Sequence, residues 1–139
     1  STDDTFNSGD FLYSFGKASE AIFYSILFMP DLVLVSDSVL LEWGVSAPEN
    51  MKCFLSKIEK TDVNLPELEA SFNFIEIGYL FDVKGRDTND EQDTVLAEVL
   101  AQSWRGYLAK QYPGRSFVVE VLSPEETGST VGLHFYQKR

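Results

Sequence analysis

The sequence of 139 residues contains one cysteine, one histidine and no arginine before Arg86. Because Cys53 has no second cysteine to pair with, no disulfide can form within the chain, which favours a reducing, cytoplasmic location. The single histidine, His134, excludes a site built from several histidine ligands. We therefore predict neither a metal site nor a cofactor.

Long apolar runs are also missing. The longest, Ala21 to Met29, is interrupted by Ser25 and is far too short to cross a bilayer. No basic segment precedes an apolar one in the way a signal peptide requires. The sequence therefore predicts a soluble protein without a membrane partner.

The common catalytic motifs are absent as well. No serine lies in a Gly-x-Ser-x-Gly turn, and the glycines form neither common phosphate-binding loop. The acidic run from Asp87 to Glu98 imitates part of a calcium loop, but Gln92 occupies the position where that loop needs glycine. Together these absences favour a protein that is not an enzyme.

Negative charge is abundant. Twenty-two acidic residues face eleven basic ones, and the net charge is −11. Residues 1–70 carry twelve acids against four lysines, a net charge of −8, while residues 71–139 carry ten acids against seven basic residues, a net charge of −3. Such a chain repels nucleic acid and anionic membranes, and it can attract a basic protein. The same charge also keeps a fold soluble.

Hydrophobic residues make up 44% of the chain and aromatic residues 14%, including eleven phenylalanines. This composition is typical of a packed globular protein, and the length suits one domain. We assign residues 9–139 to a single domain and residues 1–8 to a frayed N-terminus.

The clearest element is a long amphipathic helix over residues 89–111. Thr88 and Glu91 have the spacing of a capping box, and the apolar residues recur at three- and four-residue steps. The predicted apolar stripe consists of Val95, Leu96, Val99, Leu100, Ser103 and Tyr107, with Trp104 and Leu108 on its flank. Residues 116–122 and 130–137 then alternate as half-buried strands do.

The first half of the chain repeats this order. A helix is predicted over residues 9–28, ended by Pro30, followed by strands over residues 32–35 and 39–43. A short helix begins near Ser46 and ends near residue 60. Residues 65–83 stay open, since they fit either a helical turn or a strand.

These elements predict an α+β fold in two layers. Two hairpins and a possible fifth strand would form a mostly antiparallel sheet of four or five strands, with two long helices and one short helix. The order helix, strand, strand occurs in both halves, which indicates a structural pseudo-repeat.

Two groups of residues are candidates for a binding site. Alternation along the last two strands places His134 and Tyr136 on one face and Glu120 on the face opposite its apolar neighbours. With Arg105 of the long helix, these residues could bind a small molecule or supply a general base, or they could be ordinary surface residues.

The second group consists of Tyr13, Tyr24 and Trp43, which lie off the main apolar stripes. Exposed tyrosine and tryptophan are favoured in protein interfaces, although each could instead shield the rim of its own core. We therefore predict a small, acidic, non-enzymatic protein-binding module, such as an inhibitor or immunity-type partner of a basic protein. The alternatives are a small-molecule-binding domain or enzyme with a pocket between helices and sheet, and an oligomer of the chain with itself.

Overall fold

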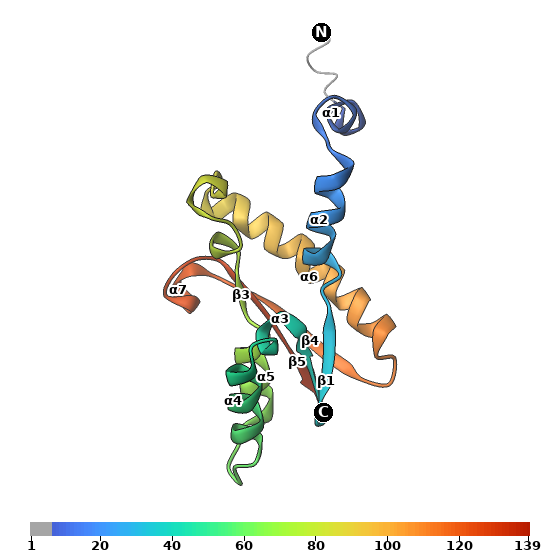
Figure 1. Cartoon of the computed structure of the whole chain (residues 1–139). Coiled ribbons are helices and arrows are strands. Elements are labelled where there is room, and N and C mark those ends of the chain that lie inside the picture. The colour runs from blue at the N-terminus through green and yellow to red at the C-terminus, as the bar shows by residue number, and fades with distance from the viewer. Residues whose placement is uncertain (1–6) are drawn as a thin grey trace.

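The computed structural model of the chain describes residues 7–139 and has an α+β architecture (Figure 1). The predicted fraying of residues 1–8 therefore falls mostly outside the described residues. Within the described part there are seven α-helices and five strands. In chain order the α-helices and strands are α1 (Ser8–Phe15), α2 (Ala18–Phe28), β1 (Leu32–Val35), β2 (Ser38–Leu41), α3 (Glu42–Val45), α4 (Pro48–Ile58), α5 (Leu65–Phe72), β3 (Ile75–Glu76), α6 (Asp90–Gln111), β4 (Ser116–Leu122), α7 (Pro124–Thr127) and β5 (Gly132–Lys138). Two short 3-10 helices, η2 (Ile77–Tyr79) and η3 (Val83–Gly85), lie between β3 and α6.

The strands form two small antiparallel sheets. β1 pairs with β2, and a separate sheet has the order β3-β5-β4. The α+β class and the antiparallel pairing are therefore confirmed, whereas the single four- or five-stranded sheet and the pseudo-repeat are not.

A buried side chain stands where the two sheets approach each other. The amide nitrogen of Asn73 donates to the carbonyl oxygens of Val39 in β2 and Phe135 in β5, at 3.1 and 3.3 Å. The side-chain oxygen of Asn73 accepts from the backbone N–H of Leu41 at 2.8 Å. Because these backbone groups are satisfied by a side chain, β2 and β5 do not join into one sheet.

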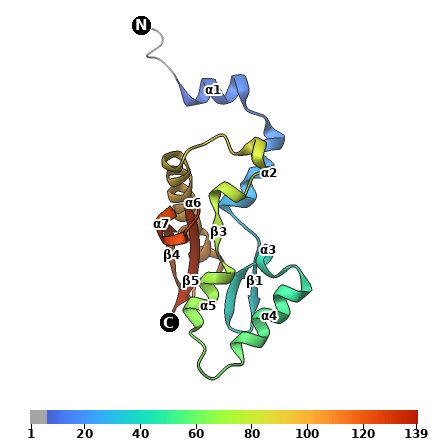
Figure 2. The same cartoon turned by 90° about the vertical axis from the view of Figure 1, so that its left-hand side faces the viewer.

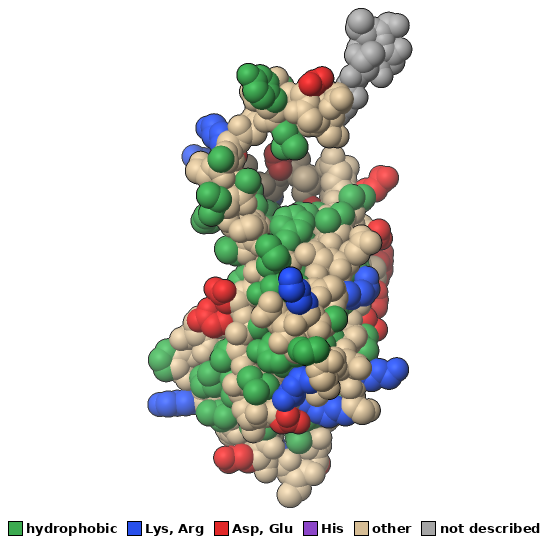
Figure 3. Space-filling model, turned by 90° about the vertical axis from the view of Figure 1, so that its right-hand side faces the viewer, with side chains coloured by type: hydrophobic (Ala, Val, Ile, Leu, Met, Phe, Trp, Pro, Cys, Tyr) green, Lys and Arg blue, Asp and Glu red, His purple; other side chains and the backbone are tan. Residues whose placement is uncertain are grey.

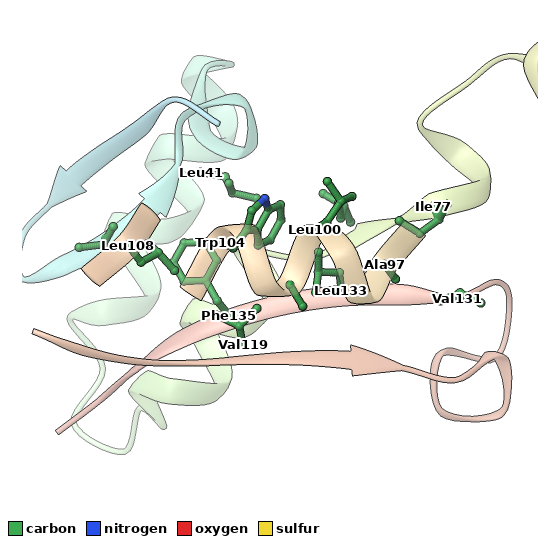
Figure 4. Close-up of a cluster of buried hydrophobic side chains, with 13 residues drawn as sticks. Leu41, Ile77, Ala97, Leu100, Trp104, Leu108, Val119, Val131, Leu133 and Phe135 are labelled. Carbon is green, nitrogen blue, oxygen red and sulfur yellow. The ribbon is translucent and has the colours of Figure 1, made fainter. Parts of the chain in front are cut away.

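The first hydrophobic cluster is formed by α6 with the three-stranded sheet and β2 (Figure 4). The helix buries Ala97, Leu100, Ala101, Trp104 and Leu108 against that cluster. The predicted stripe was partly wrong, since Val95 and Val99 are 59% and 46% exposed. Two alanines and Trp104 make the buried face, because small side chains let the helix lie close to the sheet.

A second cluster lies on the other side of the hairpin. Its buried members are Val35, Leu40, Val45, Phe54 and Leu68, contributed by β1, β2, α3, α4 and α5. Successive residues of a strand point to opposite faces, and here both faces of β2 meet a hydrophobic cluster. That explains why the sequence of β2 is almost continuously apolar.

The open segment at residues 65–83 contains both of its predicted alternatives. Asn64 caps α5 by accepting from the backbone N–H of Glu67 at 3.1 Å. The strand is limited to Ile75–Glu76, paired with β5. The chain then turns into η2.

Two predicted helix starts were wrong by about one residue. The capping box of α6 joins Asn89 and Gln92, not Thr88 and Glu91. At α4 the cap position is Ala47, which makes no side-chain hydrogen bond. The hydroxyl of Ser46 instead donates to the carbonyl oxygen of Trp43 in α3. At α6 several capping residue types are adjacent, so the spacing alone does not choose among them, and at α4 Pro48 occupies the first helical position and makes Ala47 the cap.

The helix predicted over residues 9–28 is instead two helices, α1 and α2. Gly16 and Lys17 between them have extended backbones. A Cβ at Gly16 would lie 2.6 Å from the carbonyl oxygen of Leu12, so the backbone at the end of α1 leaves room only for glycine at this position. Figures 1 and 2 show these helices extending away from the sheets. The first predicted helix therefore does not form a layer over the sheets, and its contact with the first hydrophobic cluster comes from Leu27 and Phe28 at the end of α2.

Candidate functional site

The most unusual surface of the described chain is its N-terminal arm, which we define as residues 8–29. None of the residues of α1 or α2 is buried. Large apolar side chains that are 42 to 92% exposed are Phe11, Leu12, Tyr13, Phe15, Ile22, Phe23, Tyr24, Ile26 and Met29. Figure 3 shows hydrophobic side chains along this projecting part of the molecule. Contiguous exposed apolar surface is uncommon in proteins, whereas isolated exposed apolar residues are ordinary.

Among the described residues, the hydrogen bonds that anchor the arm to the body lie at its C-terminal end. The indole N–H of Trp104 donates to the carbonyl oxygen of Leu27 at 2.8 Å, and the hydroxyl of Ser103 donates to that of Phe28 at 2.7 Å. These bonds satisfy carbonyls that the end of α2 leaves without a helical partner. Leu27 and Phe28 also pack against the first hydrophobic cluster. These contacts hold the C-terminal end of α2 on the body, and α1 lies at the opposite end of the arm.

A groove of about 360 Å³ lies beside the arm. Phe23 and Tyr24 of α2 line one side, and Trp43 of α3 with residues 79–81 lines the other. The rings of Tyr24 and Phe81 meet edge to face at 6.3 Å. This groove is aromatic on both sides and continuous with the exposed face of α2.

The groove contains two of the three aromatic residues singled out by the sequence. Tyr24 and Trp43 line it together. Tyr13 lies on α1, outside the groove, and is 92% exposed. Sequence reasoning missed Tyr79 and Phe81 as groove residues. They lie in and beside the short helices η2 and η3, whose sequences have no periodic apolar pattern.

Three of the four other candidates gather on the open face of the three-stranded sheet. Glu120 and His134 are directly paired across β4 and β5, and their side chains approach to 2.8 Å between Oε1 and Nε2. The ring of Tyr136 lies 6.0 Å from that of His134. Arg105 is separate, since it comes from α6 on the other face and donates to the carbonyl of Val119 at 2.7 Å.

The surroundings of His134 offer limited chemistry. Its side chain is 17% exposed and that of Glu120 is 48% exposed, in an open hollow beside α5. Glu126 lies near the same hollow, and its pKa is lowered mainly because the backbone N–H of Ser123 donates to its carboxylate, with a smaller contribution from the charge of His134. Among residues 7–139, no three His, Cys, Asp or Glu side chains are grouped to hold a metal ion.

A buried polar network joins the hairpin to the end of β5, and no sequence pattern indicated it. Glu69 is 1% exposed, and its carboxylate accepts from the hydroxyl of Ser38 at 2.5 Å and from the backbone N–H of Gln137 at 2.9 Å. The guanidinium of Arg139 completes the set at 2.8 and 3.2 Å. These hydrogen bonds raise the pKa of Arg139. With its oxygens occupied in this way, Glu69 has a structural role.

Comparisons with known proteins do not add a relative. No protein-family model, curated protein or solved structure matches the chain. Within the part of the chain that the structure describes, no helix combines the length and the apolar character needed to span a bilayer.

Proposed function

We propose that this chain is a non-enzymatic protein-binding module whose contact surface is the N-terminal arm with its adjoining groove. The observation that carries the proposal is the exposure of large apolar side chains throughout residues 11–29. Burying a side chain such as phenylalanine, leucine or isoleucine is worth roughly 1.5–3 kcal/mol. A partner that covers the arm would recover that stabilisation.

The size of the exposed surface supports this assignment. Aromatic side chains offer about 150–250 Å² each, so the exposed fractions of the five aromatic residues of the arm amount to roughly 600 Å². A standard specific interface buries about 800 Å² on each partner. The aliphatic residues of the arm and the walls of the groove add to the aromatic share. The surface is thus large enough for a stable complex.

The net charge of −11 bears on any partner other than a second copy of the chain. We propose that such a partner is basic, as in the pairing of an acidic inhibitor or immunity protein with a basic target. The negative field would steer the approach, and the aromatic side chains would then be buried. Association with a basic partner would weaken as salt screens the charges.

The open sheet face supports a second candidate function, binding of a small molecule. The observation in its favour is the hydrogen bond between His134 and Glu120 beside a hollow of about 310 Å³. Glu120 is exposed, and Arg105 lies on the other face of the sheet. The hollow therefore offers only Glu120 and His134 as polar groups from this candidate set, beside Tyr136. Ligand sites are usually more enclosed, so this surface supports the alternative less strongly than the arm supports protein binding.

Capture from an extract of the source cells tests the proposed function. The baits are the unchanged chain, a Phe15→Ser/Phe23→Ser variant of the arm, and a Leu55→Ser control on α4, where the side chain is 40% exposed. We expect a basic protein to bind the first and third baits at about 50 mM salt, to be lost from the second, and to bind less at about 500 mM salt. Equal capture by all three baits would contradict the arm as the contact surface, and no capture by any would contradict a basic partner.

A further inference from the structure

We infer that a second copy of this chain covers the N-terminal arm, with α1 of each copy lying in the groove of the other. The inference rests on the proposed function of the arm as a protein contact, and it names the partner of that contact. It is built from the stability of α1, the direction of the arm, the chemistry of the groove and the charges around it.

The helix α1 needs contacts beyond its own residues. It has eight residues, none of them buried, and a cap from Asn7, whose side chain accepts from two backbone N–H groups. Isolated helices shorter than about 12–15 residues are marginal in water, and a cap contributes only about 1 kcal/mol. A second surface against its apolar side chains would supply the missing stabilisation.

The direction of the arm points to a surface outside its own chain. The extended backbones of Gly16 and Lys17 carry α1 beyond the start of α2, away from the sheets (Figure 2). Figure 3 shows an opening between α1 and the rest of the molecule. The groove lies further along, where α2 itself forms one wall. In this arrangement α1 does not reach the groove of its own chain.

The groove and α1 have matching chemistry. Leu12, Tyr13 and Phe15 of α1 are 66, 92 and 70% exposed. The groove offers aromatic walls from Tyr24 and Trp43, and its volume of about 360 Å³ is open to the exterior. Apolar side chains of one copy can therefore be buried against apolar walls of the other, which is the usual character of interfaces between identical subunits.

Charge near the two surfaces does not oppose their contact. The arm carries Asp10 and Glu20 against Lys17, so its net charge is only −1 and opposes self-association far less than the whole chain would. The loop beyond the groove carries Lys84 and Arg86, and the guanidinium of Arg86 lies 4.7 Å from the ring of Tyr79. The same loop carries Asp82, which accepts from the backbone N–H groups of Lys84 and Gly85, and Asp87, so it has no net charge. An incoming α1, whose one acid is Asp10, would thus meet no strong repulsion there.

Exchange of α1 between two copies gives a closed dimer. Each copy gives one arm and receives one, so the contact is the same on both copies and a two-fold dimer leaves no unfilled groove. Two arms with roughly 600 Å² of exposed aromatic surface each fall within the range of about 1,200–2,000 Å² that stable interfaces bury in total. A dimer is therefore the assembly that this geometry favours.

Disulfide trapping tests the arrangement directly. In a Cys53→Ser background, one chain carries Leu12→Cys on α1 and a second, longer tagged chain carries Tyr79→Cys in the groove; all three positions are exposed. After mixing and mild oxidation, we expect the two chains to be joined through these positions. A matched mixture that carries Leu55→Cys in place of Tyr79→Cys should give at least tenfold less product. Equal products from both mixtures would overturn the inference.

Sedimentation of the unsubstituted chain and of Phe15→Ser completes the test. We expect a dimer that dissociates on dilution and a dissociation constant at least tenfold higher for the variant. Sedimentation as a monomer up to about 100 µM, well above the micromolar affinities of ordinary complexes, would overturn the inference. So would a disulfide that joins Leu12→Cys and Tyr79→Cys within a single chain carrying both. A monomer that still captures a basic protein through the arm would retain the proposed function and lose only the dimer.

Discussion

The carboxylate of Glu69 and the guanidinium of Arg139 form two hydrogen bonds, at 2.8 and 3.2 Å, although they are 70 positions apart in the chain. Glu69 is buried in α5, and Arg139 follows the last strand. Ser38 of the hairpin contributes a third side chain to the same carboxylate. This one acidic group therefore holds α5, the hairpin and the end of β5 together.

Removal of Arg139 should destabilise the fold. With Arg139→Ala the buried carboxylate of Glu69 loses its charged partner, and we expect the free energy of unfolding in urea to fall by about 2–4 kcal/mol. Arg115→Ala is the comparison variant and should cost less, because its ion pair is with Asp37, which is 74% exposed, although it also loses a hydrogen bond to the side chain of Gln137. Equal losses for the two variants would show that burial of Glu69 is not decisive.

The pH dependence of this pair has a definite sign. The pKa of Arg139 is raised in the folded chain by its hydrogen bonds to Glu69, so its contribution is complete below the ordinary arginine pKa and is lost only at higher pH. The difference between the unchanged chain and Arg139→Ala should therefore stay constant from about pH 6 to about pH 9. A difference that shrinks within this range would contradict the assignment.

Asn73→Ala should lower stability more than an ordinary asparagine substitution. It removes the side chain that satisfies backbone groups of Val39, Leu41 and Phe135 between the two sheets. Each buried group left unpaired costs about 1–3 kcal/mol, so we expect a loss of roughly 3 kcal/mol or more in urea unfolding. Asn64→Ala, which removes the cap of α5, should cost about 1 kcal/mol.

Truncation should destabilise the fold strongly at Phe54 and very little at Phe15. Phe54 is completely buried in the second cluster, and Phe54→Ala should cost about 3–5 kcal/mol. Phe15 is 70% exposed, and Phe15→Ala should change stability by less than about 0.5 kcal/mol when the chain is dilute enough to be monomeric. Thermal or urea unfolding measures both. A large loss for Phe15→Ala in the monomer would mean that the arm packs on its own chain.

Acid should weaken the turn that contains α7. The pKa of Glu126 is lowered from its ordinary value of 4.5, chiefly by the backbone N–H of Ser123. A lowered pKa contributes stability above the ordinary value, and this contribution is lost as the pH falls through the folded value. Glu126→Gln keeps an acceptor without a charge, so its unfolding midpoint should fall less between about pH 6 and about pH 3. Glu125→Gln, in the same turn, should behave as the unchanged chain does.

Local patterns predicted several elements well. Strand β1 spans Leu32–Val35 and β4 spans Ser116–Leu122, as the apolar run and the alternation indicate. The same alternation placed His134 and Tyr136 on one face of their strand and Glu120 opposite the apolar residues of its own strand. The contact between Glu120 and His134 depends on the register of β4 against β5, which the pattern of each strand alone does not predict.

The polar interior could not be predicted because its partners are distant. Glu69 lies 31 positions from Ser38, and Asn73 lies 62 positions from Phe135. In sequence both look like ordinary polar residues at the end of a short helix. Their burial appears only when two sheets and a helix meet.

The arm was misjudged for a different reason. A row of apolar residues predicts that a helix face is covered, and it does not distinguish the chain's own sheet from another molecule. Gly16 lies inside the predicted helix, where glycine is unfavourable. The break at this glycine directs α1 outward, and no residue of α1 is buried.

The extended connection at Gly16 and Lys17 also makes α1 separable. A trypsin-like protease cleaves after lysine, and here that peptide bond stands in an exposed, non-helical segment ahead of α2. One cut would release α1 while both hydrophobic clusters, the two sheets and the Glu69 network stay whole. The ability to associate could thus be switched off irreversibly without denaturing the protein.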